Sequence, residues 1–165
     1  MNRNHEFFMR EALVLAEKAM AADEVPIGCV IVQNGEIIGR GYNRRTAMKN
    51  ALYHAELIAI HEACGRAGDW RLEDCVLYVT IEPCPMCACA IIQARVPSVV
   101  FGARNRKAGC AGSILNILQE PAFNHQTAVE EGVLRDECAG LMTAYFARLR
   151  KPKNNADAPP DGETP

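Results

Sequence analysis

The stretch Cys75-Val76-Leu77-Tyr78-Val79-Thr80 leads through Ile81-Glu82 into Pro83-Cys84-Pro85-Met86-Cys87, and this junction decides the fold. Its first half is rich in β-branched and aromatic residues, which predicts a buried strand. Pro85 suits the first position of a helix, because the N–H that proline lacks would have no partner there. We therefore expect a strand that runs almost directly into a helix.

The segments on either side continue the alternation of strands and helices. Runs of β-branched residues predict strands over 25–33, 36–42 and 96–102, with Asn34-Gly35 as a hairpin turn. A helical period predicts helices over 5–22, 57–64 and 134–150. The remaining expectations are a helix from Pro85 to about Arg95, loops over 43–53 and 102–113, Gly65 or Gly68 as the end of the second helix, and a short helix over 114–118. Strands separated by helices predict an α/β fold with helices on both faces of a mixed sheet.

Length and composition place the chain among globular proteins. Its 165 residues, 49% hydrophobic and 23% charged, allow one domain, which we assign to residues 1–151. The proline-rich segment 152–165 is expected to be a disordered tail. The apolar run 13–20 contains Glu17 and Lys18, so we expect neither a signal peptide nor a membrane span, and a cytoplasmic location. The eight cysteines then indicate buried residues or metal ligands rather than disulfides.

The net charge of −2 conceals two basic windows without any acidic residue. The first lies between Glu36 and Glu56, and the second lies between Glu82 and Glu120. Their positive residues are Arg40, Arg44, Arg45 and Lys49, then Arg95, Arg104, Arg106 and Lys107. The windows are either chance clusters on solvated loops or a local surface for a polyanion.

The Cys84-x-x-Cys87 pair at a helix start is the first feature with chemical meaning. It places both sulfurs on one face, where the helix dipole favours thiolates. Two thiolates make half of a tetrahedral zinc site, and a neutral imidazole such as His54 is a natural third ligand. A redox pair or two buried cysteines are the alternatives for Cys84 and Cys87 taken alone.

Glu56 adds a candidate proton carrier. In a regular helix, residues 54 and 56 would point about 200° apart. His54 and Glu56 can address one site only if they form the first, irregular turn of the helix, and the preceding loop favours this. A closed structural site would need a fourth ligand. Cys89 faces away on the helix, while Cys110 could approach from its loop, so the spacing favours an open, catalytic zinc without excluding the closed site.

The two segments His54-Ala55-Glu56 and Pro83-Cys84-Pro85-Met86-Cys87 resemble the zinc nucleoside and nucleobase deaminases, whose general signature is well established. Within that superfamily the chain is similar to the bacterial tRNA-specific adenosine deaminases from about residue 6 to 151. The more specific similarities are Val25-Pro26-Ile27-Gly28, Leu77 to Cys84, Phe101-Gly102-Ala103-Arg104, Gly112-Ser113, Asn124-His125 and Asp136-Glu137-Cys138-Ala139.

This resemblance implies a three-layer α/β/α fold, like that of cytidine deaminase, around a mixed five-stranded sheet. It also implies one Zn²⁺ per subunit and hydrolysis of adenosine to inosine at wobble position 34 of a tRNA anticodon. His54, Cys84 and Cys87 would bind the metal, and Glu56 would pass the proton of the zinc-bound water to N1 of adenine and then to the leaving amine. Asn43 would bind the base edge in a pocket shaped by Ile27, Ala55 and Pro83.

The resemblance gives the basic windows a use, since their loops could hold an anticodon stem-loop. We expect RNA contacts from Arg104, Asn105, Phe146 and Arg150, although Phe146 could equally face the core. Many relatives have Asp where this chain has Asn105, and we hypothesise that the amide relaxes discrimination against DNA. Relatives are homodimers, which makes a homodimer the expected state. The apolar residues Ala88, Ile91 and Ile92 would suit either an interface or a core.

Two other functions remain open at this point. A deaminase of free guanine, cytidine or adenosine would share the metal motif, but would not need the basic windows. A non-catalytic zinc module that binds RNA would not need Glu56.

Overall fold

The computed structural model describes residues 3–150, so the predicted tail over 152–165 and the end of the predicted domain lie outside the described residues. Four helices and five strands make up this part of the chain. Their bounds are α1 Arg3–Ala21, β1 Gly28–Gln33, β2 Glu36–Tyr42, α2 Ala55–Ala67, β3 Cys75–Ile81, α3 Pro85–Gln93, β4 Ser98–Ala103, β5 Ala128–Glu131 and α4 Arg135–Arg150.

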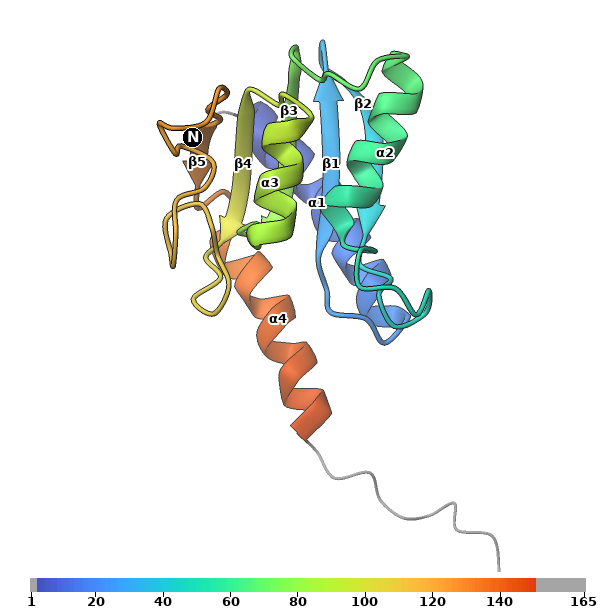
Figure 1. The fold of residues 1–165 in the computed structure, drawn as a ribbon. Helices are drawn as coiled ribbons and strands as arrows, with labels where there is room; N and C mark the ends of the chain where they lie inside the picture. The colour runs from blue at the N-terminus through green and yellow to red at the C-terminus, as the bar shows by residue number, and fades with distance from the viewer. Residues whose placement is uncertain (1–2, 151–165) are drawn as a thin grey trace, which may run out of the picture.

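One mixed sheet with the strand order β2-β1-β3-β4-β5 forms the middle layer (Figure 1). β1 is antiparallel to β2 and β3, while β3, β4 and β5 run parallel to one another. Helices α2 and α3 lie side by side on one face, while α1 and the first half of α4 pack on the other, and α4 then extends past the end of the sheet (Figure 1). The predicted α/β/α fold with a five-stranded mixed sheet is therefore confirmed.

Two apolar clusters fill the two interfaces between the layers. Ile31, Leu77 and Phe101 are fully buried, or nearly so, beneath α2 and α3. Ala88, Ile91 and Ile92 of α3 join the same cluster with exposures of 0%, 0% and 4%. These three residues belong to the core, and the prediction that they could form an interface is wrong. Within residues 3–150, no helix combines the length and apolar character that crossing a membrane requires.

The hairpin between β1 and β2 follows the sequence prediction. Asn34 and Gly35 have φ values of 51° and 82°, the pair of positive values that a tight type I′ turn needs. The predicted strand over 25–33 begins late, at Gly28, because Ile27 N–H is bonded to the carbonyl of Val25 in a local turn, and Pro26 has no N–H to give.

Helix α2 lies directly against the backbone of β2. A Cβ atom at Gly41 would collide with the carbonyl oxygen of Ala55, the first residue of α2, and would come within 2.8 Å of the Ala59 nitrogen. Glycine therefore allows β2 to hold the beginning of α2 in close contact with the sheet.

In the second half of the chain one prediction is wrong and one strand was not predicted. Residues 114–118 form no helix: Ala111 and Asn116 make an isolated antiparallel bridge, which folds this segment back on itself. The position of β5 was not predicted from the sequence, because its four residues are mostly exposed and show no apolar alternation. Its pairing with β4 creates this strand, and local propensity does not.

Candidate active site

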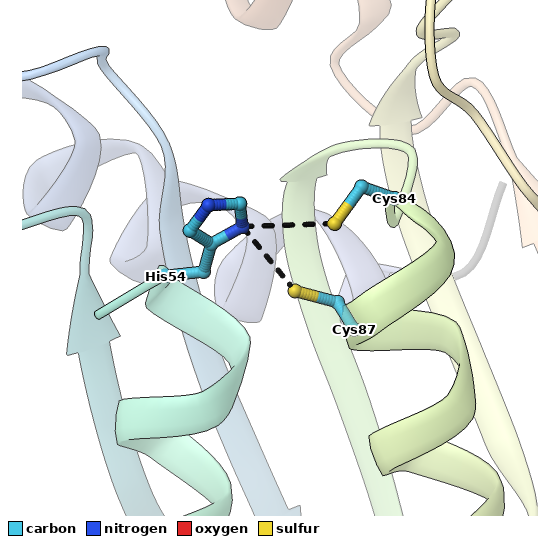
Figure 2. Close-up of side chains that lie close together, drawn as sticks. All are labelled: His54, Cys84 and Cys87. Carbon is cyan, nitrogen blue, oxygen red and sulfur yellow. Dashed lines mark hydrogen bonds between the residues drawn. The ribbon is translucent and has the colours of Figure 1, made fainter. Parts of the chain in front are cut away.

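Two helices on the same face of the sheet begin at one point. His54 is the N-cap residue of α2 and Cys84 is the N-cap residue of α3, and each has extended backbone angles. Cys87 lies one turn into α3, so its sulfur turns toward the same point as that of Cys84 (Figure 2). Gly68 in left-handed conformation ends α2, while Gly65 lies inside the helix.

The three metal-ligand candidates lie together in this structure. His54 Nδ1 is 3.6 Å from Cys84 Sγ and 3.5 Å from Cys87 Sγ (Figure 2). All three ligand atoms lie within 4.8 Å of one another. One imidazole nitrogen and two sulfurs are the donor types that zinc prefers, so the residues present fit a zinc ion.

The site has no fourth protein ligand among residues 3–150. Cys89 is exposed on the far side of α3. Cys110 is buried, but it directs its thiol to the carbonyl of Ala108 and stays outside the group. Three ligands without a fourth characterise catalytic zinc, which keeps a position for water or substrate.

The thiols of Cys84 and Cys87 share a proton unequally. The hydrogen bond from the Cys87 thiol lowers the pKa of Cys84 to about 4, with further help from His54. The same bond and burial raise the pKa of Cys87. The hydrogen bond between His54 and Cys84 is the main cause that raises the pKa of His54.

Glu56 is the second residue of α2 and lies beneath this group. Only 3% of it is exposed, and its Oε2 has no hydrogen-bond partner among the described residues. Burial is the main cause that raises its pKa, and the negative charge of Cys84 adds to it. An unpartnered buried carboxylate oxygen is costly for folding, which favours a functional role for it.

Asn43 lies at the same end of the sheet, just after β2, and is 5% exposed. Its Nδ2 donates a hydrogen bond of 3.5 Å to Oε2 of Glu24, and its backbone N–H donates to the carbonyl of Ile27. Glu24 also accepts a bond of 2.7 Å from Ala47 N, so this buried carboxylate fixes both the amide and the following loop. Sequence reasoning missed Glu24, because nothing in the local pattern marks an acid whose partners lie in a later loop.

A second carboxylate missed from the sequence is Glu82, which is 2% exposed. Its oxygens accept hydrogen bonds from the N–H groups of Asn105, Ala111 and Ser113 at 2.9–3.0 Å, and from the Ser113 hydroxyl. Burial raises the pKa of Glu82, but these bonds outweigh burial and hold the pKa below its ordinary value. Because Pro83 and Cys84 follow immediately, Glu82 ties the loop over 104–113 to the metal-binding turn.

The residues expected to contact RNA lie on the surface. Arg104 forms an ion pair of 2.7 Å with Glu131, and Asn105 Oδ1 accepts bonds from the N–H groups of Lys107 and Ala108. Phe146 is 44% exposed, so the alternative that it faces the core is wrong. The neighbouring Tyr145 is buried instead, and its hydroxyl bonds to the carbonyl of Asp23.

Comparison with known proteins identifies the family. Residues 2–103 match the family described as the cytidine and deoxycytidylate deaminase zinc-binding region. The tRNA-specific adenosine deaminase of Bacillus subtilis is 52% identical over 151 residues, which cover 92% of this chain and 94% of the relative. The chain belongs to the tRNA-specific adenosine deaminases of this zinc-binding family. A tRNA-specific adenosine deaminase of Streptococcus pyogenes serotype M18 is 50% identical over 91% of this chain and 94% of its own length.

Solved structures agree with the family and also show its breadth. A structure from a study of A-to-I editing by tRNA:A34 deaminases superposes with a TM-score of 0.79, at 40% identity over 82% of this chain and 98% of the other. Guanine deaminase from Bacillus subtilis superposes with a TM-score of 0.60, at 33% identity over 93% and 97%. The shared fold therefore serves deaminases of different substrates, and the substrate of this family member depends on the surroundings of the zinc site.

Proposed function

We propose that this protein hydrolyses adenosine to inosine and ammonia at wobble position 34 of a tRNA anticodon. The observation that carries the proposal is the open group of His54, Cys84 and Cys87 with the buried Glu56 beside it. Identity of 52% to a tRNA-specific adenosine deaminase supports the choice of substrate.

The three ligands would hold one zinc ion at the paired helix ends. When bound in an open site of this kind, zinc lowers the pKa of water to about 7 and so supplies hydroxide at neutral pH. Glu56 handles the protons: its carboxylate takes one proton from the attacking water and passes it to N1 of the adenine ring, and it then transfers the proton of the new C6 hydroxyl to the leaving amine. The bond from C6 to the amine nitrogen breaks, and a bond from C6 to oxygen replaces it.

Asn43 orients the base. One N–H of its amide is held by Glu24, which leaves the second N–H and Oδ1 for the edge of the purine. Ile27, Ala55 and Pro83 surround the place where the ring would lie, and Ala55 and Pro83 are buried. A fixed amide in an apolar pocket selects a base by its hydrogen-bonding edge.

The RNA strand is held by the basic windows. Arg45 is close enough to His54 for its charge to oppose protonation of the imidazole. Arg104, Asn105, Phe146 and Arg150 supply further polar, aromatic and cationic groups. The target base must leave its stack, and an anticodon loop makes this least costly because its bases are already unpaired.

We also propose a cytoplasmic homodimer with one zinc ion per subunit. An apolar groove of about 300 Å³ supports the dimer, and Leu52 in its lining is 57% exposed. The groove is lined by Asn50, Leu52, Tyr53, Leu57, Ile58 and His61. Light scattering of the purified protein measures the subunit number directly.

Mass analysis of an anticodon stem-loop carrying adenosine at position 34 tests the function, with zinc measured on the same sample. We expect conversion of that adenosine to inosine, and no ammonia from guanine, cytidine or free adenosine. Glu56→Ala should retain zinc and lose turnover by at least about a hundredfold, the usual contribution of a positioned acid–base group. Turnover of free guanine alone would replace the proposal with a free-base deaminase, and activity in Glu56→Ala would refute the role of Glu56.

A further inference from the structure

A second pocket, of about 390 Å³, lies where β4 and β5 end and α4 begins. Its lining residues are Ala103, Arg104, Arg106, Glu131, Arg135 and Ala139. Half of them are arginines, and these come from two segments that are distant in the sequence. Arg104 and Arg106 belong to the second basic window, whereas Arg135 lies outside both windows. The fold therefore adds a positive charge that the windows did not predict.

The arginines of the pocket are only partly neutralised. Arg104 bonds to Glu131 at 2.7 Å. Arg106 and Arg135 form no ion pair in the part of the chain that the structure describes. Glu131 is the only acid that lines the pocket, so two guanidinium groups there remain available to an anion.

Both free arginines extend from segments that are held in place. Gly132 has a φ of 89°, and a Cβ atom there would lie 3.0 Å from Nη2 of Arg135, so glycine leaves room for the guanidinium over the turn. The Gly132 N–H bonds to the carbonyl of Phe101. On the other side, Asn105, the neighbour of Arg106, donates its N–H to the buried Glu82. The backbone that carries each arginine is therefore fixed on its side of the pocket, so less chain entropy is lost when an anion binds there.

The pocket and the metal-ligand group share one edge of the sheet. β3 and β4 are parallel, and Ile81 pairs with Ala103 at their carboxyl ends. From Ile81 the chain continues into the turn that carries Cys84, and from Ala103 it continues into Arg104. Figure 1 shows the end of β4 beside the beginnings of α3 and α4. An extended polyanion whose base enters the metal site would pass along this edge.

We propose that Arg106 and Arg135, with Arg104 beside them, bind a phosphodiester group of the substrate RNA. Guanidinium groups suit this ligand because their planar N–H donors match pairs of phosphate oxygens. Contacts of this kind fix the position of a strand without reading its sequence. The proposal rests on the RNA substrate proposed above, and it adds a subsite distinct from the base pocket.

Salt-dependent binding tests this subsite. The zinc-loaded full chain is titrated into a labelled anticodon stem-loop at several salt concentrations, as wild type, Arg106→Gln and Arg135→Gln. Loss of one phosphate contact should reduce the slope of log Kd against log salt by about 0.7–0.9 and weaken binding about sixfold at 0.1 M salt. Steady-state kinetics should show a raised KM with kcat unchanged. Arg71→Gln is the control, because Arg71 is also exposed to solvent but precedes β3, at the opposite end of that strand, where it pairs with Asp69.

Each result decides the proposal. Reduced slopes for Arg106→Gln and Arg135→Gln, but not for Arg71→Gln, support it, even if the stem-loop is not deaminated. Slopes equal to that of Arg71→Gln overturn it, while inosine formation by the wild type leaves the proposed function intact. Inorganic phosphate is titrated separately and followed at the Gly132 amide by NMR. Saturable phosphate binding that Arg135→Gln abolishes, combined with unchanged RNA slopes, would identify a small-anion site and overturn the RNA assignment.

Discussion

Replacing Glu82 with Gln removes one charge and exchanges one oxygen for an NH₂ group without changing the size of the side chain. Whichever way the amide is turned, its NH₂ group must meet N–H donors of the loop: Asn105 on one side, or Ala111 and Ser113 on the other. The Ser113 hydroxyl can rotate to accept a bond, but a backbone N–H cannot. At least one buried donor therefore loses its partner.

The size of the effect follows from these contacts. A hydrogen bond to a charged group contributes about 1.5–3 kcal/mol, and an unpaired buried donor costs about 1–3 kcal/mol. We expect Glu82→Gln to lower the free energy of unfolding by about 3 kcal/mol, which for a chain of this length lowers Tm by roughly 6–12 °C. The matched control is Glu36→Gln: the Glu36 side chain is exposed and forms no hydrogen bond or ion pair among residues 3–150, so this variant should change Tm by less than about 2 °C.

Thermal unfolding by circular dichroism measures the stability, and hydrogen exchange locates the change. Exchange should accelerate at Asn105, Ala111 and Ser113, whose amides bond to Glu82, before it accelerates in β3. Unchanged protection of these three amides, together with a Tm equal to that of Glu36→Gln, would refute the conclusion that Glu82 holds the loop.

Three further outcomes are expected. Gly41→Ala should lower the free energy of unfolding by about 3 kcal/mol, the upper end for overpacking, because the new methyl group meets the backbone of α2. Gly65→Ala adds its methyl group in open space on α2 and should instead raise the free energy of unfolding by up to about 1 kcal/mol. Equal urea midpoints for the two variants would contradict this reasoning. Cys84→Ser should lose most of the zinc measured by mass spectrometry while Cys89→Ser keeps it, and full zinc content in Cys84→Ser would remove Cys84 from the ligand set. Asn105→Asp keeps the oxygen that caps the turn at Lys107, and should raise the ratio of RNA to DNA deamination about tenfold, the effect of one charge-assisted hydrogen bond; an unchanged ratio would dismiss the hypothesis.

Local patterns predicted the elements whose cause is local. The β-branched run before Pro83 marks β3, Asn34-Gly35 marks the hairpin, and Pro85 marks the beginning of α3. The proposed ligands could be named from spacing, because a helix start fixes the relation between Cys84 and Cys87.

What the sequence did not reveal depends on contacts between distant segments. β5 exists because β4 offers it an edge, and residues 114–118 follow a bridge to Ala111 rather than their own helical spacing. Glu24 and Glu82 each hold a loop far along the chain, and a single sequence gives no sign of such partners. Arg135 is an ordinary helix residue until the fold brings it beside Arg106.

The shared origin of α2 and α3 has a consequence for handling the protein. His54 and Cys84 are the N-cap residues of the two helices that form one outer layer of the molecule. A cation bound between them would therefore cross-link α2 and α3. Ligands that bind only the folded state stabilise it in proportion to the logarithm of their concentration. A chelator in the storage buffer should therefore lower the stability of the folded protein as well as abolish its activity. Values of Tm are comparable only when they are measured at the same free metal concentration.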